Sequence, residues 1–432
     1  MTANPMKNLQ QTRYRLSWIQ QVAEVPREQW DALAQPLISP FFEWDWLQGL
    51  EASGSATGRS GWQPCHLVVW REDPPQSGVA PQRRLVAAAP LYLKAHSYGE
   101  FVFDHQWADL AHRLGVEYYP KLLGMSPFTP AVGYRFLMDP DEDEAALTEA
   151  MVAEIDQFCD RNNISGCHFL YVDPDWRSPL ESLGFMPWLH HNSVWHNQGF
   201  QTFEDYLTMF NANQRRNIKR ERKAMAKAGL RLVTVTGEQI SHRLLEQMYS
   251  FYSHHCDRFG WWGSKYLTKA FFVDLHHALR HRLLLVAAVA TDTPTDGQEA
   301  GTIAAGTDLD ATDLKPVGMS FCVYKGDRLY GRYWGSFQEF DCLHFNACYY
   351  TPIEWAIDHG VQIFDPGAGG SHKKRRGFPA TPHHSLHRFY HDRLGQILQS
   401  HLHQVNPLVA QEMEAINQEL PFTKPEIELP RF

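Results

Sequence analysis

The chain has 432 residues, of which 44% are hydrophobic, and it carries a formal net charge of -9. This length and composition predict two or three domains with a large buried core. The acidic balance excludes a general nucleic-acid coat protein, so a polyanion would have to bind at a local basic patch. The seven cysteines include no CxxC pair, which favours a reducing compartment and excludes a disulfide framework.

Segments that could target the chain to a membrane or to secretion are missing from the sequence. The N-terminal stretch MTANPMKNLQQTRYRLSW contains no apolar segment of signal-peptide length. The longest clean apolar run, residues 283–290, is far shorter than the roughly 20 residues that a membrane span needs. We therefore expect a cytoplasmic protein without a transmembrane segment.

Short strand-like runs alternate with helix-like segments along the chain. In chain order, strands are expected at residues 66–70, 85–93, 167–172, 230–235, 283–289 and 361–364. Helices are expected at residues 144–159, 203–210, 213–228 and 244–259. This alternation predicts an α/β (α+β) architecture. We divide the chain into an N-terminal lobe, residues 1–195, and a C-terminal lobe, residues 196–432.

Two stretches are rich in aromatic residues. The first, GEFVFDHQWADLAHRLGVEYY at residues 99–119, combines Asp104 and Asp109 with paired tyrosines, and Lys121 follows it. Aromatic walls with carboxylates suit a sugar or peptide groove, but they suit a helix packed by aromatic residues equally well. The second, LYGRYWGS at residues 329–336, is better explained as a buried strand with a glycine bulge.

The expected helix at residues 213–228 carries a strongly basic face. At about 100° per residue, seven cations fill an arc of roughly 160°, while Glu221 lies outside it. These cations are Arg215, Arg216, Lys219, Arg220, Arg222, Lys223 and Lys227. Like charges at i,i+4 spacing destabilise a helix, so a face of one sign favours an anionic partner such as phosphates, a diphosphate or an RNA backbone. A solvated helix face that aids solubility explains the pattern equally well.

A glycine-rich, cationic stretch, FDPGAGGSHKKRRGF, occupies residues 364–378. It is not a P-loop, because His372 precedes Lys373 where a glycine is required and Lys374 stands where a hydroxyl should bind magnesium. It is not a dinucleotide fingerprint either, because His372 takes the place of the third glycine and Pro379 follows soon afterwards.

The residues before this stretch predict where it lies. Thr351 to Glu354, TPIE, resembles a capping box that would start a helix, and Gly360 suits the end of that helix. A short strand would follow at residues 361–364, so the glycines would leave its carboxyl end, where open α/β sheets bind ligands. The alternative is a flexible surface loop with solubilising cations.

The 23 histidines raise the question of a metal site. The densest groups are His383, His384 and His387, and His254 and His255 with Cys256. Neither group matches a metal-ligand framework such as H-E-x-x-H or CxxC, so we expect no metal.

Ordered segments along almost the whole chain resemble the FemABX-like predicted N-acyltransferases, a peptidoglycan biosynthesis/recognition family of the GNAT superfamily. The matching segments lie at residues 39–56, 100–122, 126–135, 213–225, 266–272, 329–336, 343–360 and 365–378. The resemblance implies two tandem GNAT-like lobes, each a mixed sheet flanked by helices. It also implies transfer of an acyl or aminoacyl group to an amine, on an acceptor like a peptidoglycan precursor.

The resemblance further implies that the partners are rich in phosphate, with aminoacyl-tRNA as the acyl donor and no DNA. Acetyl-CoA is less favoured, because the sequence shows no clear Arg/Gln-x-x-Gly-x-Gly/Ala signature ahead of a helix. The alternatives are a non-catalytic recognition protein for cell-wall precursors, an acetyl-CoA-dependent N-acetyltransferase acting on a small amine, and an RNA-binding protein.

The resemblance also assigns roles to individual residues. The family loop usually reads Gly-Ala-Gln-Gly-Glu-His-Lys; here Gly369 and Ser371 replace the glutamine and the glutamate, which puts a general base at position 371 in doubt. Asp365 or His372 is then the candidate for proton transfer. Candidate substrate-binding residues are Gly367, Gly369 and Gly370 in the loop, Lys373 and Arg376 as a clamp on anionic substrate, Arg215, Arg216, Lys219 and Arg220 for phosphates, and Tyr119 and Lys121 for an acceptor groove.

Overall fold

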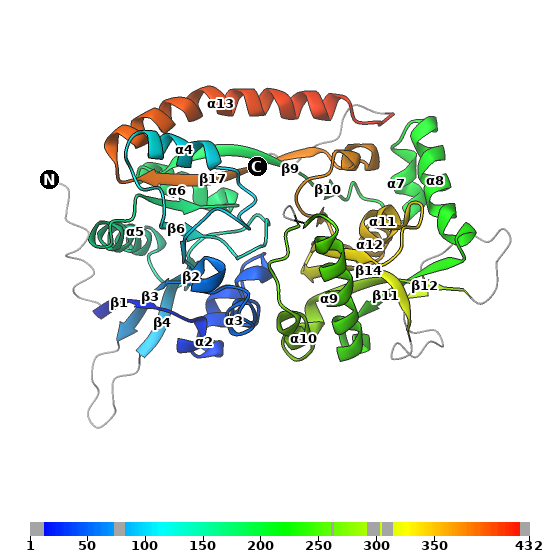
Figure 1. Cartoon of the computed structure of the whole chain (residues 1–432), viewed down its shortest axis with the longest axis horizontal. Coiled ribbons are helices and arrows are strands. Elements are labelled where there is room, and N and C mark those ends of the chain that lie inside the picture. Colours follow the sequence, from blue (N-terminus) through cyan, green and yellow to red (C-terminus); the bar gives the residue numbers. More distant parts are fainter. Residues whose placement is uncertain (1–12, 73–82, 261–262, 292–302, 305–313, 424–432) are drawn as a thin grey trace. The chain divides into compact units, whose positions relative to one another are not determined.

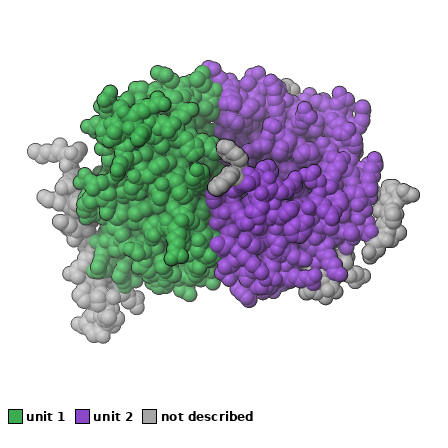
Figure 2. All heavy atoms as spheres, viewed as in Figure 1, with its two compact units in different colours: residues 1–190, 383–409 green, residues 191–382, 410–432 purple. Residues whose placement is uncertain are grey.

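A computed structural model describes residues 13–72, 83–260, 263–291, 303–304 and 314–423 (Figure 1). The chain forms two compact units (Figure 2): unit 1 is residues 1–190 with 383–409, and unit 2 is residues 191–382 with 410–432. The sequence-based division after residue 195 assigned residues 383–409 to the second lobe, whereas the structure packs them in unit 1. The chain passes between the units inside strand β9 (Met186–Ser193), strand β17 (Ala380–Phe389) and helix α13 (Asp392–Gln418).

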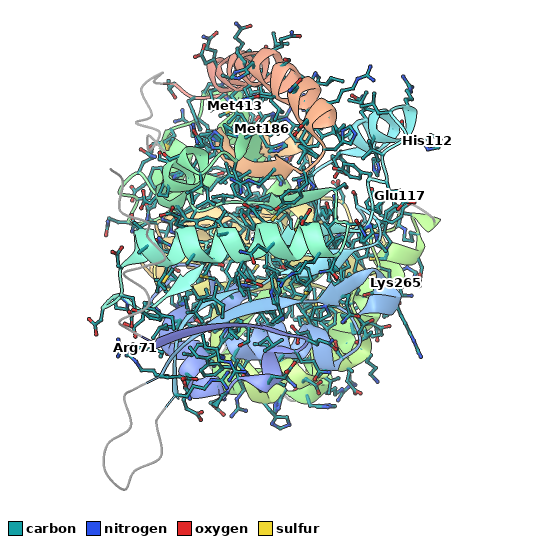
Figure 3. All side chains as sticks on the ribbon, turned by 90° about the vertical axis from the view of Figure 1, so that its left-hand side faces the viewer. Arg71, His112, Glu117, Met186, Lys265 and Met413 are labelled. Atoms are coloured by element: carbon teal, nitrogen blue, oxygen red, sulfur yellow. The ribbon has the colours of Figure 1, made fainter. Side chains whose placement is uncertain are left out.

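Unit 1 contains a four-stranded antiparallel sheet. Its order is β1 (Arg13–Ile19), β3 (His66–Glu72), β4 (Arg83–Ala89) and β7 (Leu137–Met138). The accompanying helices are α2 (Arg27–Ala34), α3 (Trp44–Ala52) and α5 (Glu144–Arg161), with 3-10 turns η1 (Val22–Glu24), η2 (Pro40–Phe42) and η3 (Gly58–Ser60). Helix α5 covers the sheet by stacking Phe158 on Trp18, whose ring centroids are 4.0 Å apart. Arg71, labelled in Figure 3, pairs with Glu142 just before that helix.

A second sheet in unit 1 has the order β2 (Trp62–Pro64), β5 (Tyr92–Lys94), β6 (Lys121–Gly124), β8 (Gly166–Phe169), β17 and β9. Strands β6 and β8 are parallel, while β2, β5 and β6 pair antiparallel. Helix α6 (Pro174–Ser182) follows β8, and helix α4 (His105–Arg113) packs on the start of α13. In that contact Trp107 joins Leu394 and Leu398 in a buried cluster.

Unit 2 is built on a seven-stranded sheet. Its order is β10 (Trp195–His196), β16 (Ile363–Asp365), β15 (Arg328–Ser336), β14 (Pro316–Lys325), β12 (Leu283–Ala290), β11 (Leu230–Thr236) and β13 (Ile303–Ala304). Its helices are α7 (Phe203–Thr208), α8 (Ala212–Lys227), α9 (His242–Asp257), α10 (Lys269–Ala278), α11 (Leu343–Phe345) and α12 (Thr351–Asp358). The shorter turns are η4 (Gly237–Gln239), η6 (Arg280–Arg282), the π-helical η8 (Asn346–Tyr350) and η9 (Ser371–Arg376).

The structure confirms the α/β class and the strands and helices expected from sequence. Strand β12 is the longest apolar run of the sequence, and seven of its eight residues are buried. The helix start predicted at Thr351 is wrong. The residue before it, Tyr350, is already helical, because α11, η8 and α12 follow one another without a break from Leu343 to Asp358. No helix in the described part of the chain is long and apolar enough to cross a bilayer.

Candidate functional site

The glycine-cation loop, residues 364–378, leaves the carboxyl end of β16, which pairs in parallel with β15. Its second half folds into the 3-10 helix η9 rather than a long helix. Gly367, Gly369 and Gly370 have φ values of 91°, 73° and 92°, a region that favours glycine. At Gly367 a Cβ atom would lie 3.1 Å from the carbonyl oxygen of Gly331 on β15. The loop therefore runs close to the sheet, and that approach leaves little room for a side chain.

Both carboxylate oxygens of Asp365 are bound within the site. Oδ1 accepts a hydrogen bond from the Gly367 N–H at 2.8 Å, and Oδ2 accepts one from the Arg332 guanidinium at 3.1 Å. Arg332 is placed there by a β-bulge, because the pairing of β15 with β14 shifts register between Gly331 and Tyr333. Sequence reasoning predicted the bulge but missed Arg332, whose role depends on a contact 33 residues away.

Lys373 fixes the loop from inside. Its ammonium donates to the carbonyl oxygen of Gly367 at 2.5 Å, and only 2% of the residue is exposed. Burial lowers the pKa of Lys373 to about 8, with Asp365 opposing the shift and Arg332 adding to it. The cation therefore lies inside the loop, close to the backbone it was expected to assist.

Arg376 links the loop to the basic helix. Its guanidinium donates to Glu221 Oε2 on α8 at 2.7 Å and to the carbonyl oxygen of His372 at 2.9 Å. It also lies 3.4 Å from the ring centroid of Phe345. Tyr350 donates its hydroxyl to the same Glu221 oxygen. Because all of these partners belong to the protein, Arg376 acts in this structure as the buried anchor between α8 and the loop.

His372 lies on the more open side of the loop. Its Nε2 is 2.9 Å from the hydroxyl oxygen of Tyr349, which belongs to the π-helical turn η8. Burial lowers the pKa of His372, and Arg376 and Lys373 lower it further. The ring is therefore neutral near pH 7 and can accept a proton. His344 lies beside it, with ring centroids 5.5 Å apart, and burial lowers the pKa of His344 to about 3.

The centre of the loop offers backbone donors. Residues 368–370 are exposed, and their N–H groups have no hydrogen-bond partner among the described residues. Gly369 and Gly370 have positive φ, and successive N–H groups in such a turn can form a concave anion-binding nest. Inside the loop every bond of Asp365, Lys373 and Arg376 named above holds the backbone, so these exposed N–H groups are the donors left for a ligand.

The basic helix α8 contains the candidate phosphate ligands. Ile218 and Met225 bury its apolar face, and Glu221 points to the loop side as the helical wheel predicted. Lys219 pairs with Glu204 at 3.0 Å. Arg215 is half-buried, while Arg216 and Arg220 are exposed; none of these three side chains has an ion-pair or hydrogen-bond partner in the described part of the chain.

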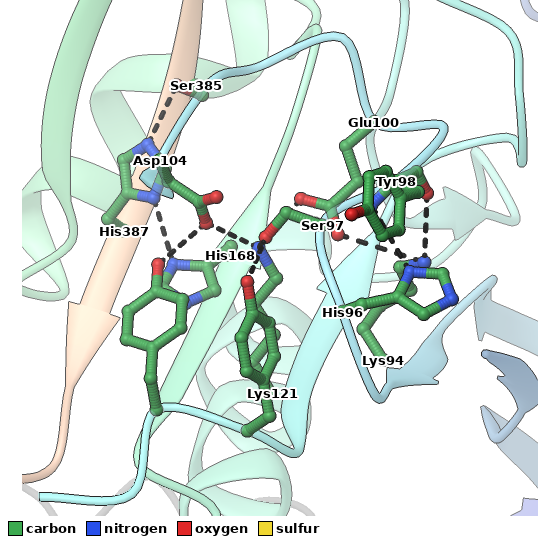
Figure 4. A network of polar contacts seen from close by, with 12 residues as sticks. Lys94, His96, Ser97, Tyr98, Glu100, Asp104, Lys121, His168, Ser385 and His387 are labelled. Carbon is green, nitrogen blue, oxygen red and sulfur yellow. Dashed lines mark hydrogen bonds and ion pairs between the residues drawn. The ribbon is translucent and has the colours of Figure 1, made fainter. Parts of the chain in front are cut away.

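The two remaining candidates, Tyr119 and Lys121, belong to unit 1 (Figure 4). The Lys121 ammonium donates to Glu100 at 2.7 Å, to Asp104 at 2.5 Å and to the Ser97 hydroxyl at 2.8 Å. Only 1% of Lys121 is exposed. The half-buried Tyr119 shares a 2.7 Å hydrogen bond with Ser97, so Tyr119, rather than Lys121, is the member that a ligand could reach.

The same network contains two groups that titrate near neutrality. Burial raises the pKa of Glu100 to about 7, although Lys121 lowers it, and Asp104 adds to the rise. Burial lowers the pKa of Lys94 to about 7, although Glu100 opposes this. The two side chains are 3.9 Å apart, and the Lys94 ammonium lies 3.7 Å from the ring centroid of Trp62. A buried pair with these pKa values changes charge within the physiological range.

The histidines form hydrogen-bonded and stacked contacts. His387 Nδ1 is 2.9 Å from His168 Nδ1, and its Nε2 is 2.7 Å from the Ser385 hydroxyl (Figure 4). His383 stacks on Tyr171 with ring centroids 4.7 Å apart. Within the described residues no group of three or more His, Cys, Asp or Glu side chains is arranged to hold a metal ion.

Comparison with known proteins gives a family match. The model of the FemAB-like family, described as peptidoglycan biosynthesis/recognition, matches residues 21–424. A search of curated proteins found no significant match.

Among solved structures, the chain is similar to FemX at 12% identity and a TM-score of 0.45, covering 89% of this chain and 100% of that one. It is similar to L-PGS from Bacillus licheniformis at 8% identity and a TM-score of 0.47, covering 89% and 97%. A tandem GNAT protein from the clavulanic acid biosynthesis pathway matches at 11% identity and a TM-score of 0.40, covering 87% and 98%.

Proposed function

The chain belongs to the FemAB-like family of peptidoglycan biosynthesis/recognition proteins, and we propose that it is a transferase that passes an acyl or aminoacyl group to an amine. The proposed acceptor is an amine on a molecule like a peptidoglycan precursor. The proposed donor is an aminoacyl-tRNA, and the reaction then takes place in the cytoplasm, where that donor is made.

One observation carries the proposal: the exposed, unpartnered N–H groups of residues 368–370 are carried by a loop that is fixed from inside. Acyl transfer to an amine passes through a tetrahedral oxyanion, and backbone donors held in place before the reaction stabilise it at little reorganisation cost. Lys373 and Asp365 hold Gly367 from its carbonyl and its N–H side, respectively. The donors that follow Gly367 are therefore positioned in advance.

His372 is the proposed general base. The attacking amine must lose a proton, and a neutral imidazole within hydrogen-bond reach can take it. The contact with Tyr349 orients the ring, and the lowered pKa keeps the ring unprotonated near pH 7. Asp365 is the weaker candidate, because both of its oxygens are already bound to the Gly367 N–H and Arg332. This assignment does not require the glutamate that the family loop usually has where Ser371 stands.

The proposed contribution of Lys373 is electrostatic. Its ammonium lies on the carbonyl of Gly367, and a positive charge beside the loop favours an anionic acyl group or oxyanion there. Loss of its proton at alkaline pH would remove that charge while leaving the side chain in place.

The experiment is a transfer assay with the purified full chain, a UDP-linked muramyl peptide as acceptor, and either aminoacyl-tRNA or acetyl-CoA as donor. Mass spectrometry detects the acylated product, and a thermal-shift measurement with each ligand reports binding separately. We expect product from aminoacyl-tRNA. The variant H372N should lower kcat by at least about 100-fold, the usual minimum for loss of a general base. The variant H401N, which changes an exposed histidine on α13, is the matched control and should keep wild-type turnover.

The outcomes separate the candidate functions. Binding of the muramyl peptide without any product would refute catalysis and support a recognition protein. Product from acetyl-CoA alone would refute the aminoacyl donor. Full activity in H372N would refute the role of that residue while leaving the reaction class intact.

A further inference from the structure

Four cations of α8 form a straight, unpaired line. Arg216, Arg220, Lys223 and Lys227 follow one another at intervals of four, three and four residues, and all four are exposed. At about 100° per residue they fall within an arc of roughly 60° opposite the buried Ile218. None has an ion-pair or hydrogen-bond partner among the residues that the structure describes. We call these four side chains the cation track.

The other cations of the helix are used differently. Arg222 turns inward, where it pairs with Glu354 at 2.8 Å and lies 4.2 Å from the ring centroid of Phe203. Lys219 pairs with Glu204. The seven-cation face expected from sequence therefore divides, and the track is the part that is bare. Like charges at these intervals repel one another along a helix, so the track is an unfavourable arrangement in the absence of an anion.

The geometry of the track points to a regular anion. Eleven residues of α-helix rise about 16 Å, and the four cations divide that length into nearly equal steps. Consecutive phosphates along one strand of a nucleic acid present negative charges at a comparably regular, short interval. A single pyrophosphate would contact only one or two of the four side chains.

The track does not have the composition of a bilayer-binding surface. Helices that lie in a membrane interface insert apolar side chains next to their cations. The apolar side chains of α8, Ile218 and Met225, are 0% and 1% exposed because they pack in the core of unit 2. A line of charge without an exposed apolar partner suits a hydrated phosphate backbone.

The inner side of the same helix holds the candidate site. Glu221 on α8 binds Arg376 of the glycine-cation loop, and Tyr350 donates to the same carboxylate. We propose that the cation track binds consecutive phosphates along one strand of an RNA, the body of the acyl donor, while the acyl end of that donor reaches the loop. This inference rests on the proposed function for the identity of the RNA, but the binding of a phosphate strand can be tested without any transfer.

The test compares the wild-type chain with the variant R216Q/R220Q/K223Q/K227Q. The probe is a synthetic RNA minihelix, aminoacylated or not, and its binding is followed by fluorescence anisotropy over a range of salt concentrations. Each neutralised phosphate contributes about 0.7 to 0.9 to the slope of log K against log salt. Loss of four contacts should therefore flatten the slope by about 3 and weaken binding at low salt at least tenfold.

A matched control makes the same change of net charge elsewhere. The variant R59Q/R113Q/R243Q/R393Q removes four exposed arginines outside α8 and should keep both the slope and the affinity. The track variant should unfold at or above the wild-type temperature, because it relieves repulsion between like charges. A loss of RNA binding would then not come from misfolding.

The remaining outcomes decide against the inference or against the function separately. Wild-type RNA affinity and slope in the track variant would overturn the inference. Unchanged RNA binding with lost binding to vesicles containing an anionic phospholipid would also overturn it, in favour of a membrane surface. RNA binding that depends on the track without any acylated product would support the track and refute the proposed reaction. Transfer from aminoacyl-tRNA at the wild-type rate in the track variant would do the reverse.

Discussion

The pair between Glu221 and Arg376 should couple the stability of α8 to that of the glycine-cation loop. Arg376 is 3% exposed at its side chain and Glu221 is 14% exposed, so removing either partner leaves the other charge largely buried. Such a loss costs about 3 to 5 kcal/mol, and the contact of Arg376 with Phe345 adds about 0.5 to 2 kcal/mol. We therefore expect R376M and E221M each to lower the free energy of unfolding by about 3 to 5 kcal/mol.

The double variant distinguishes a buried pair from two independent contacts. In E221M/R376M both charges are replaced by apolar side chains, which removes the cost of an unpaired charge. We expect its loss to be close to that of one single variant rather than the sum, giving a coupling energy of at least about 2 kcal/mol. Urea unfolding followed by tryptophan fluorescence measures all four proteins of the cycle. Losses that add within about 0.5 kcal/mol would refute the reasoning, because they would show that the two side chains do not share their burial cost.

Three further predictions concern the loop and the unit 1 network. G367A should lower stability by about 1 to 2 kcal/mol, because its φ of 91° disfavours a side chain and its Cβ would press on the Gly331 carbonyl; G369A, with open space around it, should cost less, and equal losses in thermal unfolding would contradict the close approach. Because the pKa of Lys373 falls to about 8 on folding from a model value of 10.5, the unfolded chain binds more protons between these values, so wild-type stability should rise with pH there relative to K373M, and parallel pH profiles would count against it. Because the pKa of Glu100 rises to about 7 on folding from a model value of 4.5, wild-type stability should fall between pH 4.5 and 7 relative to E100Q, which unfolding temperatures across that range would detect or exclude.

Sequence periodicity was sufficient for the elements whose pattern is local. Strand β12 follows from its continuous apolar run, and α8 follows from the opposition of Ile218 to its cations. The family match over residues 21–424 confirms the FemABX-like resemblance drawn from ordered segments. The helix start at Thr351 failed because the capping pattern ignores what precedes it: residues 343–350 are already helical, so no cap is needed there.

The candidate site was predictable as a loop but not as a set of contacts. The glycines and cations marked residues 364–378, yet the sequence could not show that Lys373 and Arg376 bond inward. Arg332, Glu221 and Tyr349 join the site through pairings with residues 33, 155 and 23 positions away, and no local pattern reports such distances. The glycine at position 331 was the one signal for Arg332, because it predicted the bulge that redirects this side chain.

The π-helical turn η8 makes this part of the chain intolerant of changes in length. Its two neighbouring tyrosines serve different partners, Tyr349 at His372 and Tyr350 at Glu221, while Phe345 just before the turn covers Arg376. Deleting one residue from the turn would restore ordinary helical spacing and rotate everything before it by about 100° relative to α12. Phe345 would then leave Arg376 even though every side chain of the site was still encoded. For protein engineers this helix is a reading frame in space: substitutions can be tried along it one by one, but an insertion or deletion shifts all of its contacts at once.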